Sequence, residues 1–185
     1  HESPIRGETF VTRKITRAVS KMALGLQEKL YLGNLDSKRD WGHAKDFVRM
    51  MWMILQAEKP DDWVIATGET HTVRDFVKLC FNYVGVNIEF KGVGSDEVGI
   101  VTETSNSSYK FFSGQTLVFV DPKYFRPTEV DILVGNYSKA KKELGWKPET
   151  TLNDLVEDMM KSDLELMEKD LSLNKLGYNT ENYFE

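Results

Sequence analysis

Short apolar runs alternate along this chain with longer segments in which apolar residues recur at helical spacing. The runs have strand length and cover residues 29–34, 63–67, 87–91, 98–103 and 116–120. Helical spacing extends over residues 8–24, 42–58, 72–84, 138–144 and 152–167. Strands that alternate with helices in this order predict an α/β fold.

The ends of three helices carry their own signals. Asp40 precedes the pattern over 42–58 and is expected to cap that helix. The pairs Thr72 with Asp75 and Thr151 with Asp154 have the spacing of a capping box. The sequence therefore predicts that helices begin directly after positions 72 and 151.

Other segments lead to expectations about burial. The run Trp63–Thr67 is predicted to be a strand buried on both faces, as parallel sheets require. Four cations decorate the helix over 8–24, and for most of them we expect a solvated face: Arg13, Lys14, Arg17 and Lys21. The Met-rich residues Met50–Met53 are expected to pack. Residues 171–185 are weakly patterned and are predicted to be a loose tail.

Composition limits the class of protein. The chain has 185 residues, 41% of them hydrophobic, which suffices for the core of one domain. A net charge of −5 argues against non-specific binding of nucleic acid, and no apolar run approaches the ~18 residues of a membrane span. Cys80 is the single cysteine of the sequence, so no internal disulfide can form and we expect a reducing, cytoplasmic environment. It lies in an apolar helical pattern, so we expect a buried thiol.

The stretch from Leu32 to Asp46 combines glycines, two adjacent cations and the entrance to a helix. Such a stretch can cradle a phosphorylated ligand, because the first N–H groups of a helix are free. The alternative is an ordinary loop with solvated charges. Further along, Pro127 restrains Arg126 to extended backbone, which would aim a guanidinium suited to phosphate. The alternative for Arg126 is a surface ion pair with Glu129 or Asp131.

Four segments of the sequence together resemble a known enzyme family. They are His-Glu-Ser-Pro-Ile-Arg-Gly-Glu-Thr-Phe-Val-Thr-Arg-Lys-Ile from residue 1, Leu-Gly-Asn-Leu-Asp-Ser-Lys-Arg-Asp-Trp-Gly-His-Ala-Lys-Asp from residue 32, Tyr-Phe-Arg-Pro-Thr-Glu-Val from residue 124, and Leu-Gly-Trp-Lys-Pro from residue 144. In this order the segments are similar to those of the GDP-mannose 4,6-dehydratases, which are extended short-chain dehydrogenases/reductases. The resemblance runs from residue 1 to about residue 170.

The resemblance implies that residues 1–170 are the C-terminal, GDP-sugar-binding region of such an enzyme. That region would hold the remaining Rossmann strands and helices and a small α/β substrate-binding domain. The glycine-rich turn, the catalytic Thr or Ser, the Glu and the Tyr-x-x-x-Lys pair of the family would lie upstream. We therefore expect no catalytic residue in this chain, and no metal site.

The resemblance also implies roles for ten residues. His1 and Arg6 would close over the nicotinamide end of NADP. Substrate contacts are expected from Thr12, Lys14, Leu32, Gly33, Asn34, Arg39, Arg126 and Glu129. Among these, residues 32–34 would border guanine, the two arginines would clamp the diphosphate, and Glu129 would hold the ribose. Two guanidinium forks on one diphosphate are reasonable, since charge-assisted bidentate bonds are strong.

The complete family enzyme converts GDP-mannose to GDP-4-keto-6-deoxymannose with NADP, a step of GDP-fucose and deoxysugar biosynthesis, and forms homodimers or homotetramers. We expect this chain alone to be inactive. Two alternatives stay open: another nucleotide-sugar epimerase or decarboxylase of the superfamily, and a non-catalytic nucleotide-sugar-binding module. In the latter, the Met-rich helix could serve a partner.

Overall fold

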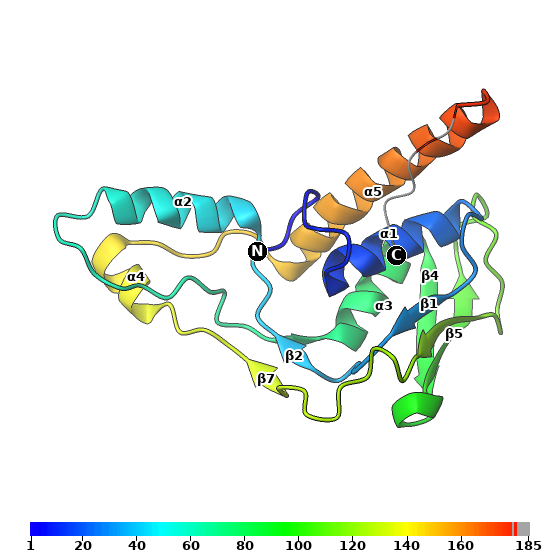
Figure 1. The fold of residues 1–185 in the computed structure, drawn as a ribbon, viewed down its shortest axis with the longest axis horizontal. Helices are drawn as coiled ribbons and strands as arrows, with labels where there is room; N and C mark the ends of the chain where they lie inside the picture. Colours follow the sequence, from blue (N-terminus) through cyan, green and yellow to red (C-terminus); the bar gives the residue numbers. More distant parts are fainter. Residues whose placement is uncertain (179, 181–185) are drawn as a thin grey trace.

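Two lobes make up the computed structural model, which describes residues 1–178 and 180 (Figure 1). The larger lobe contains a four-stranded sheet in the order β1-β6-β5-β4. Its strands are β1 (Leu30–Leu32), β4 (Val86–Lys91), β5 (Val98–Thr104) and β6 (Thr116–Val120), and the short helix η1 (Gly94–Asp96) precedes β5. β1 pairs with β6 in parallel, whereas β4, β5 and β6 pair antiparallel.

Three helices complete the larger lobe: α1 (Val11–Ala23), α3 (Val73–Tyr83) and α5 (Leu152–Lys175). They pack against one another and share one apolar core with the sheet. Both predicted capping boxes are present, at the starts of α3 and α5. The core includes Cys80, which is fully buried as predicted, and its burial raises the pKa of the thiol well above the ordinary value.

The smaller lobe consists of α2 (Ala44–Leu55), α4 (Ser138–Leu144) and the segment that follows α2 (Figure 1). Its core is centred on Met50, Ala140 and Trp146. Asp46 ties the lobe to the start of α5, since its carboxylate accepts hydrogen bonds from the amides of Glu149 (3.1 Å) and Thr150 (2.9 Å). The Met-rich helix thus packs on one side, as expected, while Met51 and other residues of its outer face are exposed.

A narrow sheet of three short strands joins the lobes: β3 (His71–Thr72), β2 (Lys38–Arg39) and β7 (Ile132–Leu133), in the order β3-β2-β7. Asp40 directly follows β2. Its carboxylate accepts hydrogen bonds from the amides of Thr67 (2.8 Å), Gly68 (2.9 Å) and Gly135 (3.1 Å), and from the Thr67 hydroxyl (2.6 Å). One side chain therefore holds three segments together at the end of β2.

This use of Asp40 corrects two predictions. The N-cap of α2 is His43, whose Nδ1 accepts from the amide of Lys45, because Asp40 is bound to other segments. Residues 63–67 do not form a strand. Within the described part of the chain no strand pairs with them, Val64 is 52% exposed, and the amide of Thr67 donates to Asp40.

Two more expectations are wrong in part. Arg13 and Arg17 on α1 are buried instead of solvated: Arg13 pairs with Asp163 of α5 (2.8 Å), and Arg17 pairs with Glu8 (2.8 Å). Their burial is possible because each guanidinium has a carboxylate partner. The predicted tail from residue 171 begins too early, since α5 continues to Lys175; residues 179 and 181–185 lie outside the described residues.

The buried pair between α1 and α5 generates a stability prediction. Asp163 accepts from Arg13 and from the Thr16 hydroxyl (2.7 Å), and it is fully buried. Asp163→Asn should lower the free energy of unfolding by roughly 3–5 kcal/mol, because it leaves a buried guanidinium without a counter-charge. Urea denaturation followed by circular dichroism measures this, with Glu165→Gln on the exposed side of α5 as control. Equal midpoints for both variants would contradict the prediction.

Candidate functional site

A cleft of about 520 Å³ lies where the start of α1, the loop after β1, strand β2 and the segment 124–129 meet. Seven of the eight residues predicted to bind substrate line it: Lys14, Leu32, Gly33, Asn34, Arg39, Arg126 and Glu129. Residues that are far apart in the sequence are thus brought to one surface. Its other lining residues are Thr9, Phe10, Val11, Ser37, Val73 and Tyr124.

The loop after β1 and the segment from Tyr124 approach each other closely. A Cβ atom at Gly33 would lie 2.1 Å from the carbonyl oxygen of Tyr124, so only glycine fits there. Next to it, the side-chain amide of Asn34 makes two hydrogen bonds to the backbone of Arg126. The Arg126 amide donates to Asn34 Oδ1 (2.8 Å), and Asn34 Nδ2 donates to the Arg126 carbonyl (2.9 Å).

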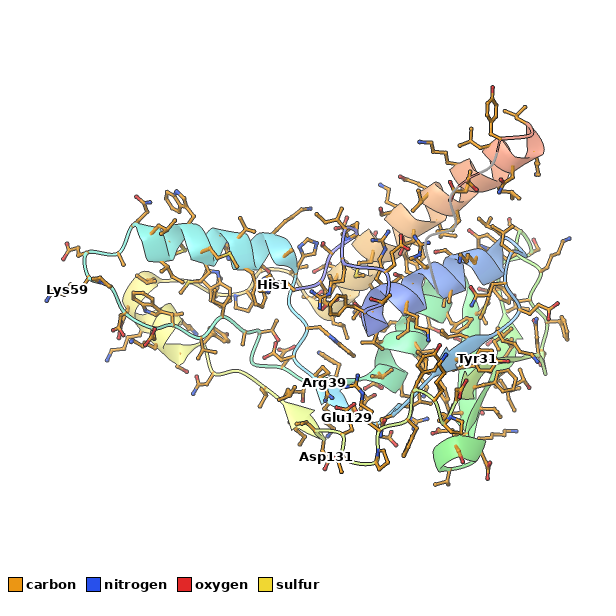
Figure 2. The ribbon with its side chains drawn as sticks, in the orientation of Figure 1. His1, Tyr31, Arg39, Lys59, Glu129 and Asp131 are labelled. Atoms are coloured by element: carbon orange, nitrogen blue, oxygen red, sulfur yellow. The ribbon has the colours of Figure 1, made fainter. Side chains whose placement is uncertain are left out.

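The two predicted arginines share one carboxylate. Arg39 Nη2 donates to Glu129 Oε1 at 2.6 Å, and Arg126 Nη1 lies 3.7 Å from Glu129 Oε2. Figure 2 shows Arg39 and Glu129 facing each other beside β2. Arg39 Nη1 also donates to the carbonyls of Lys38 and Val130, at 2.8 and 2.7 Å, which fixes its guanidinium plane. Arg126 is 77% exposed, so it keeps donors for a ligand.

The sequence left two hypotheses for Arg126, a phosphate contact or a surface ion pair with Glu129 or Asp131. Each describes part of its environment: Arg126 lines the cleft, and it also forms a long ion pair with Glu129. The charged residues that line the cleft are Lys14, Arg39, Arg126 and Glu129. Three positive charges and one negative charge leave the lining at +2. Such a surface attracts a dianion, and guanidinium forks suit phosphate oxygens.

Tyr124 is a lining residue to which sequence reasoning assigned no role. The Lys14 ammonium lies 3.7 Å from the centre of its ring, within cation–π distance. The pair stands between the cleft and a neighbouring cavity of about 500 Å³, which both residues also line. The sequence did contain a signal for this role: Tyr124 is an aromatic residue two positions before Arg126, in the segment Tyr-Phe-Arg-Pro-Thr-Glu-Val that resembles the family.

Thr12 lies outside the cleft lining. Its side chain is buried and its hydroxyl donates to Glu2. The hydrogen bond joins α1 to the N-terminal segment, where the amide of Glu2 donates to the Gly42 carbonyl (3.0 Å). Thr12 therefore orients the start of α1, and in this structure it does not reach the cleft.

His1 and Arg6 lie beside the cleft and not in its lining. The His1 ring lies on Phe47, with ring centres 4.1 Å apart, and lines a groove of about 350 Å³ that Arg39 also borders. The guanidinium of Arg6 lies 3.5 Å from the centre of the Phe10 ring. Its buried Nε has no hydrogen-bond partner among residues 1–178 and 180.

Two negative findings apply to the described residues. Within residues 1–178 and 180, no group of three or more His, Cys, Asp or Glu side chains is arranged to hold a metal ion. In the same part of the chain, every helix is too short or too polar to cross a membrane.

Comparison with solved structures defines the class of fold. The chain superposes on RMD from Pseudomonas aeruginosa complexed with NADPH with a TM-score of 0.68 at 17% identity, covering 90% of this chain and 46% of that one. It also matches UDP-glucose 4-epimerase from Thermotoga maritima with a TM-score of 0.56 at 22% identity, covering 91% and 42%. The fold is thus an α/β fold equivalent to about half of an extended short-chain dehydrogenase/reductase.

Sequence comparison defines the family. A profile of the family described as GDP-mannose 4,6 dehydratase matches residues 1–159. The chain is 57% identical over 169 residues to GDP-mannose 4,6 dehydratase of Drosophila melanogaster, covering 91% of this chain and 40% of the relative. It is 52% identical over 182 residues to the enzyme of Yersinia enterocolitica, covering 97% and 48%. This chain belongs to the GDP-mannose 4,6-dehydratase family, and it spans about half the length of these relatives.

The close approach of the two loops leads to a prediction that needs no ligand. Gly33→Ala should displace residues 124–126 and lower the free energy of unfolding by about 1–3 kcal/mol, as overpacking does. Hydrogen exchange should then accelerate at the Arg126 amide. In the control Gly7→Ala, the added methyl group meets the edge of the Phe10 ring at 3.1 Å, and that ring can turn. Unchanged exchange in Gly33→Ala would refute the argument.

Proposed function

We propose that this chain is the substrate-binding part of a GDP-mannose 4,6-dehydratase and binds the GDP moiety of GDP-mannose in the 520 Å³ cleft. The observation that carries the proposal is the convergence of Arg39, Arg126 and Lys14 on one hollow with a lining charge of +2. The diphosphate of a nucleotide sugar carries two negative charges, so ligand and cleft are complementary. Membership of the family supplies the identity of the sugar nucleotide.

The geometry supports a particular orientation of the nucleotide. The diphosphate would lie between Arg39 and Arg126, with Glu129 close enough to accept from a ribose hydroxyl. Guanine would lie against the backbone of residues 32–34, because the Asn34 side chain is already bound to the backbone of Arg126. Lys14, held over Tyr124, would donate to a phosphate oxygen or to the ribose.

The same proposal places the cofactor end of the site beside His1 and Arg6. The groove lined by His1, Glu2 and Arg39 could take a polar ligand there, and Arg6 lies next to it, with its Nε 3.7 Å from Glu2 Oε1. NADP, when bound in the whole enzyme, would supply the hydride acceptor for the sugar. The residues of this chain would contribute binding and orientation, and remote contacts of this kind serve the reaction by holding the sugar still.

Among the alternatives, the comparisons favour the GDP-mannose branch. Identity is 57% to a GDP-mannose 4,6 dehydratase, against 22% to a UDP-glucose 4-epimerase with a similar fold. The second likeness supports the fold alone. Assembly of the whole enzyme as a homodimer or homotetramer stays a prediction.

Calorimetric titration with GDP tests the proposal. GDP should bind the 185-residue chain and UDP should not. Arg126→Ala should weaken GDP binding about 10–100-fold, because a hydrogen bond to a charged group contributes about 1.5–3 kcal/mol. Lys123→Ala is the matched control, since it removes a charge from the same segment outside the cleft. Equal affinity for GDP and UDP, or equal effects of both substitutions, would contradict the proposal.

A second test concerns activity. Because the catalytic residues of the family are expected upstream of these residues, the purified chain should not convert GDP-mannose in the presence of NADP. Separation of the nucleotide sugars by chromatography after incubation measures the product. Turnover by this chain would contradict the expectation that it holds no catalytic residue.

A further inference from the structure

Arg74, the second residue of α3, lies outside the cleft lining, and its guanidinium binds two carboxylates, those of Asp36 and Glu97. Arg74 Nη2 donates to Asp36 Oδ1 at 2.8 Å, and Nε donates to the same oxygen at 3.2 Å. On the other side, Nη1 donates to Glu97 Oε1, and Nη2 donates to Glu97 Oε2 at 3.2 Å. One guanidinium is therefore shared by two carboxylates from different segments.

The Asp36 side leads to Arg39. Asp36 lies in the loop between β1 and β2, and α3 also holds this loop through its backbone. The amide of Arg74 donates to the Leu35 carbonyl (2.9 Å), and the amide of Val73 donates to the Ser37 carbonyl (3.2 Å). Arg39 follows two residues after the last of these contacts. The start of α3 thus fixes the path of the chain into the first arginine of the cleft.

The Glu97 side leads to Arg126. The Glu97 side chain is 11% exposed, and its carbonyl accepts from the amide of Val120 (3.3 Å) at the end of β6. The next amide, of Asp121, donates to the Leu32 carbonyl (2.8 Å), and the chain then turns toward Arg126. Glu97 therefore stands at the base of the segment that carries the second arginine.

We propose that Arg74 is a positioning residue that sets the separation of Arg39 and Arg126 across the diphosphate. The inference rests on the proposed function, since it assigns Arg74 a task in GDP binding. Arg74 joins the bases of both arms, so the loss of its guanidinium removes the side-chain link between them, while the backbone hydrogen bonds from α3 to Leu35 and Ser37 remain. A lysine cannot replace it fully, because one ammonium nitrogen cannot reproduce the bonds that Nε, Nη1 and Nη2 make to the two carboxylates.

Hydrogen exchange tests the mechanical part without any nucleotide. In Arg74→Gln, amides of residues 35–39 and 121–126 should exchange about tenfold faster than in the wild-type chain, whereas those of α5 should not change. Asp36→Asn should affect mainly residues 35–39, and Glu97→Gln mainly residues 121–126. If Arg74→Gln does not fold, Asp36→Asn and Glu97→Gln still test whether each contact of Arg74 orders its own segment. Unchanged exchange in both segments would overturn the inference.

GDP titration tests the link to binding. Arg74→Gln should weaken GDP binding about tenfold, Arg74→Lys less, and the control Lys78→Gln on the same helix not at all. In the background of Arg126→Ala, the effect of Arg74→Gln should shrink, because residues that act through one another are not additive. Additive effects would overturn the positioning role. A wild-type chain that does not bind GDP would refute the proposed function, and exchange would still report whether Arg74 orders both arms.

Discussion

The site depends on two contacts between the loop after β1 and the segment from Tyr124: the backbone of Gly33 lies against that of Tyr124, and the side-chain amide of Asn34 binds the backbone of Arg126. Neither residue pair is close in sequence, and the first contact is possible only because residue 33 has no side chain. The second is a pair of hydrogen bonds from one amide group to one residue. Together they hold the arginine-bearing segment over the loop after β1. Together with the pairing of β2 and β7, these contacts bring the charged side chains to one surface.

Glu129 lowers the electrostatic repulsion between Arg39 and Arg126 when no ligand is bound. Two guanidinium groups near one another repel, and a carboxylate between them lowers that cost. Arg39 is also held by two carbonyl groups, so its orientation does not depend on a ligand. Arg126 is the more exposed arginine and has only a 3.7 Å ion pair. The arrangement combines one rigid cation with one that can adjust to an incoming anion.

Local patterns and a family resemblance predicted different parts of this structure. The two capping boxes, the buried Cys80 and most helices and strands follow from spacing alone, because their causes lie within a few residues. The membership of seven residues in one cleft came from the resemblance, since spacing cannot say which distant loops meet. Errors arose where long-range partners prevailed: Asp40 binds Thr67 and Gly135 instead of capping α2, and Arg13 finds Asp163 in α5. The two ion pairs of Arg74 could not be predicted from the sequence, because neither carboxylate partner is near it in the chain.

The four hydrogen bonds on Asp40 have a consequence for protein engineering. They anchor the peptide unit just after Arg39 to segments on both sides of β2, so the backbone there is held independently of the side chain at position 39. Other side chains can therefore be placed at position 39 while these hydrogen bonds keep the backbone in place. A library confined to that position would sample the recognition of alternative anionic head groups on a constant frame.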